Sequence, residues 1–487
     1  MNILFLNPQG NFDQHDSYWT EHPDFGGQLV YVKEIAIEMA KLGHHVDIVT
    51  RYIDDPNFPA FQGMFDSYEG VENVRIVRIK ANGPEFLVKE ELWEHLSEWV
   101  DNIIHFYQKE GINIDFATGH YGDGGLACAM LKDRMQIPYS FTGHSLGAQK
   151  FDKLYKEQKD LQALEERYHF SKRILAENTA IKYADIIFVS TSQEKDEQYT
   201  HPLYKASSEG KNFVVAPPGV NTKTFAKYND HNVDSEVSKK IENYLSKDIE
   251  ESRRTLPCVL LASRLDPKKN HLGLLRTYAN SDTLQEKMNI VISLRGVEDA
   301  FKDYSNLKKN EQIILKEMMD LIKKQDLLGQ VTFINILSQD ELANTYRYFA
   351  SKKGIFCLPA LYEPFGLAPI EAMSTGLPAV VTKYGGPSEV LKEGNENFGV
   401  LIDVHEEDDI EHGLLAVLEN HKHYQEMGVK RVLSKYTWKA TAKKYVEEIA
   451  QIKQPSKGVQ IPRYFYSLRQ EDLTKNALID YTKNKGK

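Results

Sequence analysis

Cysteine is scarce in this chain. Only Cys128, Cys258 and Cys357 occur in 487 residues, and each lies in an apolar stretch. Three scattered cysteines argue against a disulfide framework or a zinc site, so we expect all three in hydrophobic cores. No apolar run approaches the roughly 20 residues of a membrane-spanning helix. Because no signal-peptide pattern precedes the first apolar segment, the sequence predicts a soluble cytoplasmic protein.

Basic residues are also fewer than acidic residues. The chain has 60 Lys and Arg against 70 Asp and Glu, a net charge of −10. Nucleic acids and anionic membranes bind basic surfaces, so we expect neither as a partner. Local groups of Lys or Arg can still bind small anionic ligands. Apolar residues make up 41% of the chain, enough for sizeable cores. At roughly 150 residues per domain, the length predicts two or three domains.

The sequence does contain a regular alternation of short apolar strands and amphipathic helices. Two such series are separated by a polar, charged stretch at residues 219–255. Strands alternating with helices are typical of parallel sheets, so we expect two doubly wound α/β domains. Longer helical patterns cover residues 91–109 and 161–182.

The polar stretch predicts the domain boundaries. We expect one domain at residues 1–220, a second at 221–453 and a tail at 454–487, whose packing the sequence leaves open. Sheets of this class bind ligands at the carboxyl ends of their strands. A site in the cleft between the two domains is therefore predicted.

The most informative stretch lies at residues 359–389. A strand at 354–358 leads into a loop with Glu363, and a helix is expected to begin at Pro369. The amides of Gly366, Leu367 and Ala368 would lie at the helix start, where a nucleotide diphosphate binds well.

Two glutamates accompany this turn. Glu363 is at the loop mouth, and Glu371, placed in the first helical turn, suits the hydroxyls of a ribose. Two solvated acids are the simpler alternative. The neighbouring Phe365-Gly366-Leu367 and Gly385-Gly386-Pro387 favour a binding site.

Two cations are predicted at the same sheet edge. Arg264 and Lys269 follow the strand at residues 259–262. Fixed cations stabilise the charge that builds up on a departing diphosphate. An ordinary basic loop is the alternative, and the glutamate loop nearby argues for the site.

In the first half, two histidines follow strands beside glycines. His120 precedes Tyr121, Gly122 and Asp123, and His144 lies between Gly143 and Ser145. Glycines permit close approach of a ligand to the backbone. Lys89, Lys150 and Arg173 are candidates for a second anion site, although spacing alone makes each a surface cation.

Six motifs occur in order along nearly the whole chain: Asn7-Pro-Gln-Gly-Asn-Phe-Asp13, Asp24-Phe-Gly-Gly-Gln28, His120-Tyr-Gly-Asp-Gly-Gly125, Thr142-Gly-His-Ser-Leu-Gly147, Ser263-Arg-Leu-Asp-Pro-Lys-Lys-Asn270 and Glu363-Pro-Phe-Gly-Leu367. Each alone is weak. Together they resemble the retaining glycosyltransferases of the GT-B fold, in the branch of sucrose-phosphate synthase and sucrose synthase, with bacterial sucrose-phosphate synthases the most similar.

The resemblance implies transfer of glucose from UDP-glucose to fructose 6-phosphate, giving sucrose 6-phosphate and UDP with retention at the anomeric carbon. It implies four residues near the reaction: His144, Glu363, Arg264 and Lys269. It implies donor contacts from Gly26, Gly27, Arg264, Lys269, Glu363, Gly366, Leu367, Ala368 and Glu371. It implies acceptor contacts from Gln28, Lys89, Tyr121, Asp123, Lys150 and Arg173.

The resemblance also implies no cofactor and no metal, and no Asp-x-Asp pair is placed to hold one. The partners expected are a sugar nucleotide and a sugar phosphate, with a separate phosphatase acting on the product. One departure is Lys172, where relatives tend to carry a second arginine beside Arg173. Lysine cannot bind a phosphate through two parallel hydrogen bonds as arginine does.

Other functions remain open at this stage. GDP-mannose could replace UDP-glucose, which would give a mannosylfructose phosphate, and free fructose could be the acceptor, as in sucrose synthase. A non-catalytic sugar-nucleotide sensor is a further alternative. An NAD-dependent oxidoreductase is disfavoured, because the first strand is followed by Asn7-Pro-Gln-Gly-Asn-Phe rather than Gly-x-Gly-x-x-Gly.

Overall fold

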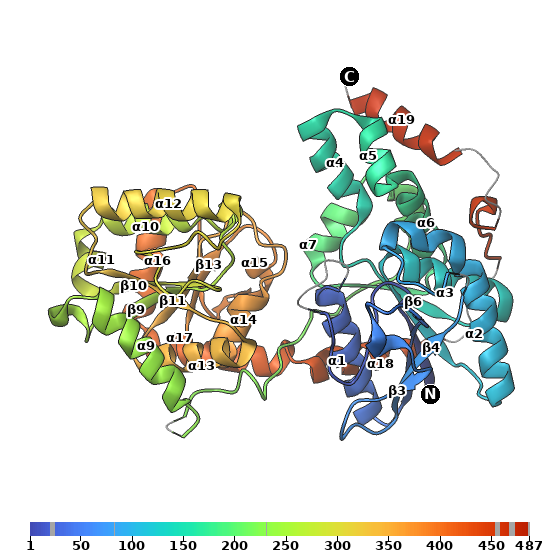
Figure 1. Ribbon diagram of the computed structural model, residues 1–487, viewed down its shortest axis with the longest axis horizontal. Coiled ribbons are helices and arrows are strands. Elements are labelled where there is room, and N and C mark those ends of the chain that lie inside the picture. The colour runs from blue at the N-terminus through green and yellow to red at the C-terminus, as the bar shows by residue number, and fades with distance from the viewer. Residues whose placement is uncertain (20–24, 82, 230, 453–457, 467–472, 486–487) are drawn as a thin grey trace. The chain divides into compact units, whose positions relative to one another are not determined.

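The computed structural model describes the chain except residues 20–24, 82, 230, 453–457, 467–472 and 486–487. The chain forms two compact units (Figure 1). Unit 1 combines Met1–Pro217 with Trp438–Lys487, and unit 2 is Pro218–Thr437.

Unit 1 is built on an eight-stranded sheet in the order β3-β4-β2-β1-β5-β6-β7-β8. Every pair is parallel except β3 with β4. The strands are β1 (Asn2–Leu6), β2 (His45–Arg51), β3 (Phe65–Asp66), β4 (Val74–Ile79), β5 (Phe116–His120), β6 (Tyr139–Thr142), β7 (Ile186–Val189) and β8 (Phe213–Val215). The short β3 had no apolar run to predict it.

Helices cover both faces of this sheet. The apolar sides of α1 and α18 pack on one face, and those of α2, α3 and α6 on the other. The helices are α1 (Gly27–Lys41), η1 (Pro59–Phe61), η2 (Lys89–His95), α2 (Leu96–Glu110), α3 (Tyr121–Met135), α4 (Gly147–Gln158), α5 (Leu161–Tyr168), α6 (Phe170–Tyr183), α7 (Ser192–Glu194), the π-helical η3 (Lys195–Tyr199), α8 (Lys205–Ser208), α18 (Trp438–Ile449), η6 (Arg463–Phe465) and α19 (Leu473–Lys485).

Unit 2 holds a six-stranded parallel sheet in the order β11-β10-β9-β12-β13-β16. A small antiparallel hairpin, β14 with β15, lies outside it. The strands are β9 (Cys258–Leu261), β10 (Asn289–Leu294), β11 (Val331–Asn335), β12 (Ile355–Leu358), β13 (Ala379–Thr382), β14 (Lys392–Glu393), β15 (Glu396–Asn397) and β16 (Val400–Ile402).

This sheet is again covered on both faces. Figure 1 shows α10 and α12 on one side and α13 and α17 on the other, which matches the two buried clusters. The helices are α9 (Ser235–Asp248), η4 (Glu251–Arg253), η5 (Pro267–Lys269), α10 (His271–Ala279), α11 (Asp282–Lys287), α12 (Lys309–Lys324), α13 (Gln339–Ser351), α14 (Leu367–Ser374), α15 (Pro387–Val390), α16 (Glu407–Glu419) and α17 (His421–Lys435). The prediction of two doubly wound α/β units is confirmed.

The domain boundaries require a correction. The chain passes into unit 2 after Pro217, three residues before the predicted 220. The prediction also put residues 438–453 in the second domain, but α18 belongs to unit 1. It packs on α1 through the buried Trp438, Ala442 and Tyr445. Of the tail at 454–487, the described part joins unit 1, while residues 454–457, 467–472 and 486–487 lie outside the described residues.

Two predicted helices are each divided. The pattern at 161–182 forms α5 and α6, because His169 adopts the left-handed region (φ 46°) and ends the first helix. The buried Glu165 carboxylate accepts from the Ser171 amide at 3.1 Å and so caps the second. The pattern at 91–109 begins within the 3₁₀ helix η2, which ends at His95, and α2 begins only at Leu96.

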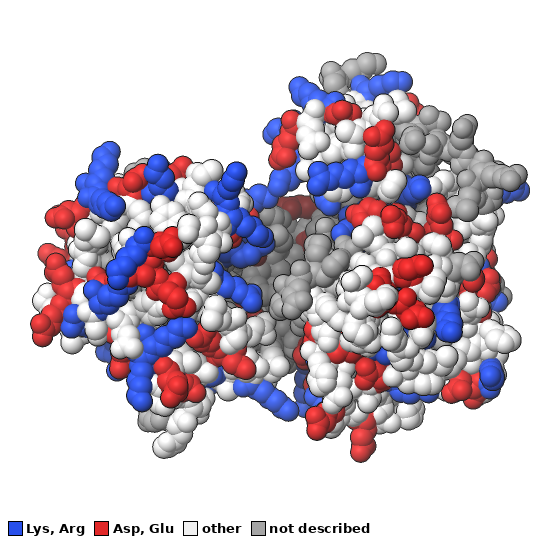
Figure 2. All heavy atoms as spheres, in the orientation of Figure 1, with Lys and Arg blue, Asp and Glu red and all other residues white. Residues whose placement is uncertain are grey.

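Two features concern possible partners: the charge of the surface and the apolar character of the helices. Acidic and basic side chains are interspersed on the face shown in Figure 2. No helix within the described residues is both long enough and apolar enough to cross a membrane.

Both sheets have a point where the strand order reverses. In unit 1, β1 lies between β2 and β5, and in unit 2, β9 lies between β10 and β12. Connections leave these neighbouring strands toward opposite faces, which opens a crevice at their carboxyl ends. The predicted site residues follow β5, β6, β9 and β12, so the topology carries them to these crevices.

Candidate active site

A pocket of about 180 Å³ in unit 1 brings together all six predicted acceptor residues. Its lining is Gln9, Gly26, Gln28, Lys89, Glu90, Trp93, Tyr121, Gly122, Asp123, Ser145, Lys150, Tyr168 and Arg173. Gly27 follows Gly26 at the start of α1. Glu90, Trp93 and Tyr168 were missed, because single residues on a helix leave no motif. Gln9 and Ser145 stand inside two of the motifs, which could have revealed them.

Three cations converge on this pocket. Lys150 lies on α4, Arg173 on α6 and Lys89 at the start of η2. Burial lowers the pKa of Lys150, and the charges of Arg173 and Lys89 lower it further. An anion bound among them would relieve this repulsion, so the pocket favours a ligand with a phosphate group.

Arg173 is held in place by a buried acid. Its Nε donates to Glu177 at 2.8 Å, and its Nη2 donates to the Ser145 carbonyl at 2.5 Å. Burial alone would lower the pKa of Arg173, but the adjacent Glu177 carboxylate outweighs it and raises the pKa. Glu177 also accepts from the Gly147 amide at 3.0 Å and from the Tyr204 hydroxyl. Glu177 was not predicted, although its i,i+4 spacing from Arg173 could have indicated the pair.

Gln28 brings an unsatisfied side-chain amide to the pocket. Its side chain is 94% buried, since only 6% is exposed, yet neither amide atom has a hydrogen-bond partner within the described residues. A buried amide left unsatisfied costs about 1–3 kcal/mol. A bound molecule with hydroxyl or phosphate oxygens at this wall of the pocket would remove that cost.

His144 is enclosed by aromatic rings. Its Nε2 is hydrogen-bonded to Nδ1 of His120 at 2.8 Å, and the edge of Tyr31 packs on it with centroids 4.9 Å apart. Burial lowers the pKa of His144 to about 3 and that of His120 well below its usual value. Both rings are therefore neutral near pH 7.

The backbone at His144 is strained. Its φ of 54° and that of Tyr121, 62°, lie in the left-handed region that favours glycine. Such strain persists where the surroundings fix the chain, commonly at active sites. His144 Nδ1 has no hydrogen-bond partner within the described residues, which leaves it able to bind a ligand.

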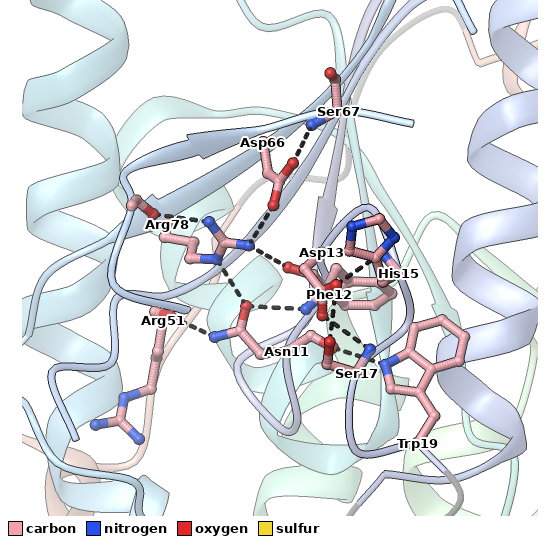
Figure 3. A network of polar contacts seen from close by, with 11 residues as sticks. Asn11, Phe12, Asp13, His15, Ser17, Trp19, Arg51, Asp66, Ser67 and Arg78 are labelled. Carbon is pink, nitrogen blue, oxygen red and sulfur yellow. Dashed lines mark hydrogen bonds and ion pairs between the residues drawn. The ribbon is translucent and has the colours of Figure 1, made fainter. Parts of the chain in front are cut away.

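A polar network secures the loop that follows β1, as Figure 3 shows. The buried Arg78 donates to the Asn11 side chain at 3.1 Å and to the Phe12 carbonyl at 2.5 Å. It also pairs with Asp66 at 3.1 Å. The network fixes the chain just beyond Gln9. Asp24 of the second motif lies outside the described residues.

In unit 2, Lys269 and Glu363 form an ion pair. Their side chains meet at 2.5 Å, although 94 residues separate them in sequence. Lys269 ends η5 after β9, and Glu363 lies in the loop after β12, at the two sides of the strand-order reversal. The structure thus joins the two predicted loops into one cluster.

Glycines let the Glu363 loop approach its neighbour. The Gly386 amide donates to the Glu363 carbonyl at 3.0 Å, and the Glu363 amide donates to the Tyr384 carbonyl at 3.0 Å. A Cβ at Gly385 would stand 2.0 Å from the Glu363 carbonyl oxygen. The Gly385-Gly386 pair is therefore required for the close packing of the two loops.

The helix start differs from the prediction by two residues. Helix α14 begins at Leu367 after Gly366, whose φ is 98°, so Pro369 is the third helical residue and not the first. The amides of Leu367 and Ala368 remain in the first turn and lack intrahelical partners there. Arg264, which follows β9, is exposed, and its side chain makes no hydrogen bond or ion pair with another described residue.

The predicted position of Glu371 also needs correction. Glu371 lies one turn inside α14 rather than in its first turn. Its carboxyl group makes no hydrogen bond to the described residues. Although the residue keeps some exposed surface, burial raises its pKa to about 8. It is thus largely protonated near pH 7 and can both donate and accept hydrogen bonds.

This raised pKa predicts how stability varies with pH. Folded Glu371 keeps a proton that the unfolded chain releases between its ordinary pKa of 4.5 and about 8, so stability falls as pH rises across that window. Glu371→Gln, which stays neutral, is expected to raise the melting temperature at pH 8 more than at pH 5. Glu396→Gln, an exposed acid in β15, is the control. An equal effect of Glu371→Gln at both pH values would show that folding does not raise the pKa of this carboxyl group.

Comparison with known proteins places these features in one family. Residues 1–245 match the model of the first GT-B domain of sucrose synthase, and residues 245–430 match that of glycosyl transferases group 1. A probable sucrose-phosphate synthase of Thermosipho melanesiensis is 45% identical over 96% of this chain and 99% of its own length. The chain belongs to the sucrose-phosphate synthase and sucrose synthase family of GT-B glycosyltransferases.

More distant relatives agree. Sucrose synthase 2 of Hordeum vulgare is 29% identical over 90% of this chain, which spans 59% of that protein. The solved sucrose-phosphate synthase of Thermosynechococcus elongatus superposes with a TM-score of 0.61 at 21% identity, covering 93% of this chain and 98% of that one. That likeness confirms the GT-B fold. The glycosyltransferase class of enzyme is established by the family.

Proposed function

We propose that this glycosyltransferase moves glucose from UDP-glucose to fructose 6-phosphate, giving sucrose 6-phosphate and UDP. The observation that carries the proposal is the pocket in unit 1, where Lys89, Lys150 and Arg173 converge beside the unpartnered amide of Gln28. This combination suits a sugar that carries a phosphate. Glu177 pairs with Arg173, and Glu90 lies 3.9 Å from Lys89. The charges of Arg173 and Lys89 nevertheless still lower the pKa of Lys150, and free fructose would bring no negative charge to offset them.

Each predicted residue has a role in this reaction. Lys89, Lys150 and Arg173 would bind the acceptor phosphate, and Gln28, Tyr121 and Asp123 would orient the sugar. Arg264, Lys269 and the amides at the start of α14 would bind the donor diphosphate. Glu371 would bind the ribose and Glu363 the glucose hydroxyls, with Gly26 and Gly27 admitting the donor phosphate.

The chemical step follows from these roles. The acceptor hydroxyl attacks the anomeric carbon on the face from which UDP departs, so the configuration is retained. The bond to the phosphate oxygen breaks as the new bond forms, and the hydroxyl proton passes to the leaving phosphate. Neutral His144 would hydrogen-bond the glucose without adding a charge. Because donor groups belong mainly to unit 2 and acceptor groups to unit 1, the proposal requires groups of both units to act on the substrates in the same step.

A product assay tests the proposal. UDP-glucose, ADP-glucose and GDP-mannose would each be offered with fructose 6-phosphate and with fructose. Sucrose 6-phosphate from UDP-glucose and fructose 6-phosphate is the expected main product. Equal turnover of free fructose, or preferred use of GDP-mannose, would overturn the assignment.

We also propose that the reaction needs no metal, because Arg264 and Lys269 can supply the positive charge that a divalent ion gives elsewhere. Excess EDTA is expected to leave turnover unchanged. Loss of activity that Mg²⁺ or Mn²⁺ restores would contradict this.

The proposed product, sucrose 6-phosphate, still carries the acceptor phosphate. A separate phosphatase would remove this phosphate to give sucrose.

A further inference from the structure

The C-terminal segment of unit 1 packs against the elements that carry the residues of the acceptor pocket. Its described parts, residues 458–466 and α19, are here called the tail. Ile461, Phe465 and Leu478 are buried in the same apolar cluster as Trp93 and Phe151. The tail is therefore part of the core of unit 1 on the side where the pocket lies.

The first contact supports the element that carries Lys89. Phe465 packs on Trp93 of η2, with ring centroids 6.4 Å apart. Trp93 lines the acceptor pocket on one side and, on the other, a second hollow of about 260 Å³ that Tyr464, Phe465 and Tyr466 also line. The Trp93 ring is thus a shared wall between the pocket and the tail.

The second contact supports the element that carries Arg173. The Lys172 ammonium lies 5.7 Å from the centroid of the Tyr464 ring, and α19 packs against α6 (Figure 1). Lys172 itself is not in the pocket lining. Its contact with Tyr464 joins α6 to the tail.

The third contact supports the element that carries Lys150. The Tyr481 hydroxyl of α19 donates to Asp152 of α4 at 2.9 Å and lies 3.1 Å from Nε2 of His201. His201 and Asp152 are also 3.1 Å apart. Because Asp152 is two residues from Lys150, this cluster fixes the first turns of α4.

The three contacts fall on the three elements whose cations repel one another. Glu177 and Glu90 compensate Arg173 and Lys89 only in part, because both cations still lower the pKa of Lys150. Before the acceptor binds, this residual repulsion favours displacement of Lys150 from the other two cations, and any displacement must be reversed on binding. Restraint from outside the pocket removes that cost, since groups held in place before binding lose less entropy.

We propose that the tail is a positioning element that keeps the three cations of the acceptor pocket in their binding arrangement. This inference rests on the proposed function for the identity of the acceptor, but the contacts themselves do not. The tail would act on acceptor binding alone and would leave donor binding unchanged.

The sharpest variant is Tyr481→Phe, which removes one hydroxyl and retains the ring. The KM for fructose 6-phosphate is expected to rise roughly 3- to 10-fold, as for a lost hydrogen bond to a charged group. The KM for UDP-glucose and kcat are expected to stay unchanged. Tyr244→Phe is the matched control, because it also removes a hydroxyl that donates to a carboxylate, that of Glu298 at 3.1 Å in unit 2.

A second variant tests the Trp93 contact. Phe465→Leu keeps the site apolar but shortens the side chain, so it should raise the same KM, while Phe465→Tyr should stay close to the parent. Melting temperatures confirm that each protein is folded. A rise in both substrate constants together, or no change in either variant, would overturn the inference.

Calorimetry with inorganic phosphate separates this inference from the proposed function. Phosphate is expected to bind the parent protein and to bind Tyr481→Phe more weakly, whichever sugar the acceptor carries. If fructose 6-phosphate fails as a substrate while this difference holds, the proposed function is wrong and the tail's role stands. Equal phosphate binding by both proteins would refute the role of the tail.

Discussion

Lys150→Ala is expected to weaken the binding of fructose 6-phosphate by about 2–5 kcal/mol, the usual effect of removing one partner from a buried charge pair. Lys150 is half-buried, and its ammonium lies 4.5 Å from the centroid of the Tyr168 ring, which restricts its position. Its pKa is already lowered by burial and by Arg173 and Lys89, so a phosphate partner stabilises its charged form.

The measurement is the Kd of fructose 6-phosphate and of UDP for the parent and the variant. Lys153→Ala removes the same charge from an exposed position on α4 that does not line the pocket. It is expected to change neither constant. If Lys150→Ala weakened UDP and fructose 6-phosphate equally, the pocket in unit 1 would not be a separate acceptor site.

The sequence could predict the strand ends, and with them most of the candidate site. Apart from β3, β14 and β15, each strand was a short, mainly apolar run, and the residues that follow β5, β6, β9 and β12 had polar or glycine-rich motifs. In a parallel sheet these ends meet at one edge. The ion pair of Lys269 with Glu363 was therefore foreseeable as proximity, although its distance was not.

Other features left no local signal. Trp93 and Tyr168 lie on helical elements whose patterns resemble any amphipathic helix, and only packing carries them to the pocket. The return of α18 to unit 1 was also hidden, since Tyr436, Thr437 and Trp438 form no glycine- or proline-rich boundary. That the predicted donor-binding and acceptor-binding residues face each other stays a prediction, because it depends on how the two units meet.

Lys269→Met is expected to lower kcat/KM for UDP-glucose by about 10²–10³-fold, the usual effect of removing a group that stabilises developing negative charge. Two explanations of such a loss compete. Lys269 would stabilise the departing diphosphate directly, or it would only neutralise Glu363, its partner at 2.5 Å.

A double variant separates these explanations. In Lys269→Met with Glu363→Gln, no carboxylate remains unpaired, so a purely neutralising role predicts recovery toward the activity of Glu363→Gln alone. A direct role predicts that the double variant stays as slow as Lys269→Met, with weaker UDP binding by calorimetry. Recovery of activity would leave Arg264 as the predicted cation that stabilises the diphosphate, since its exposed side chain makes no hydrogen bond or ion pair with another described residue.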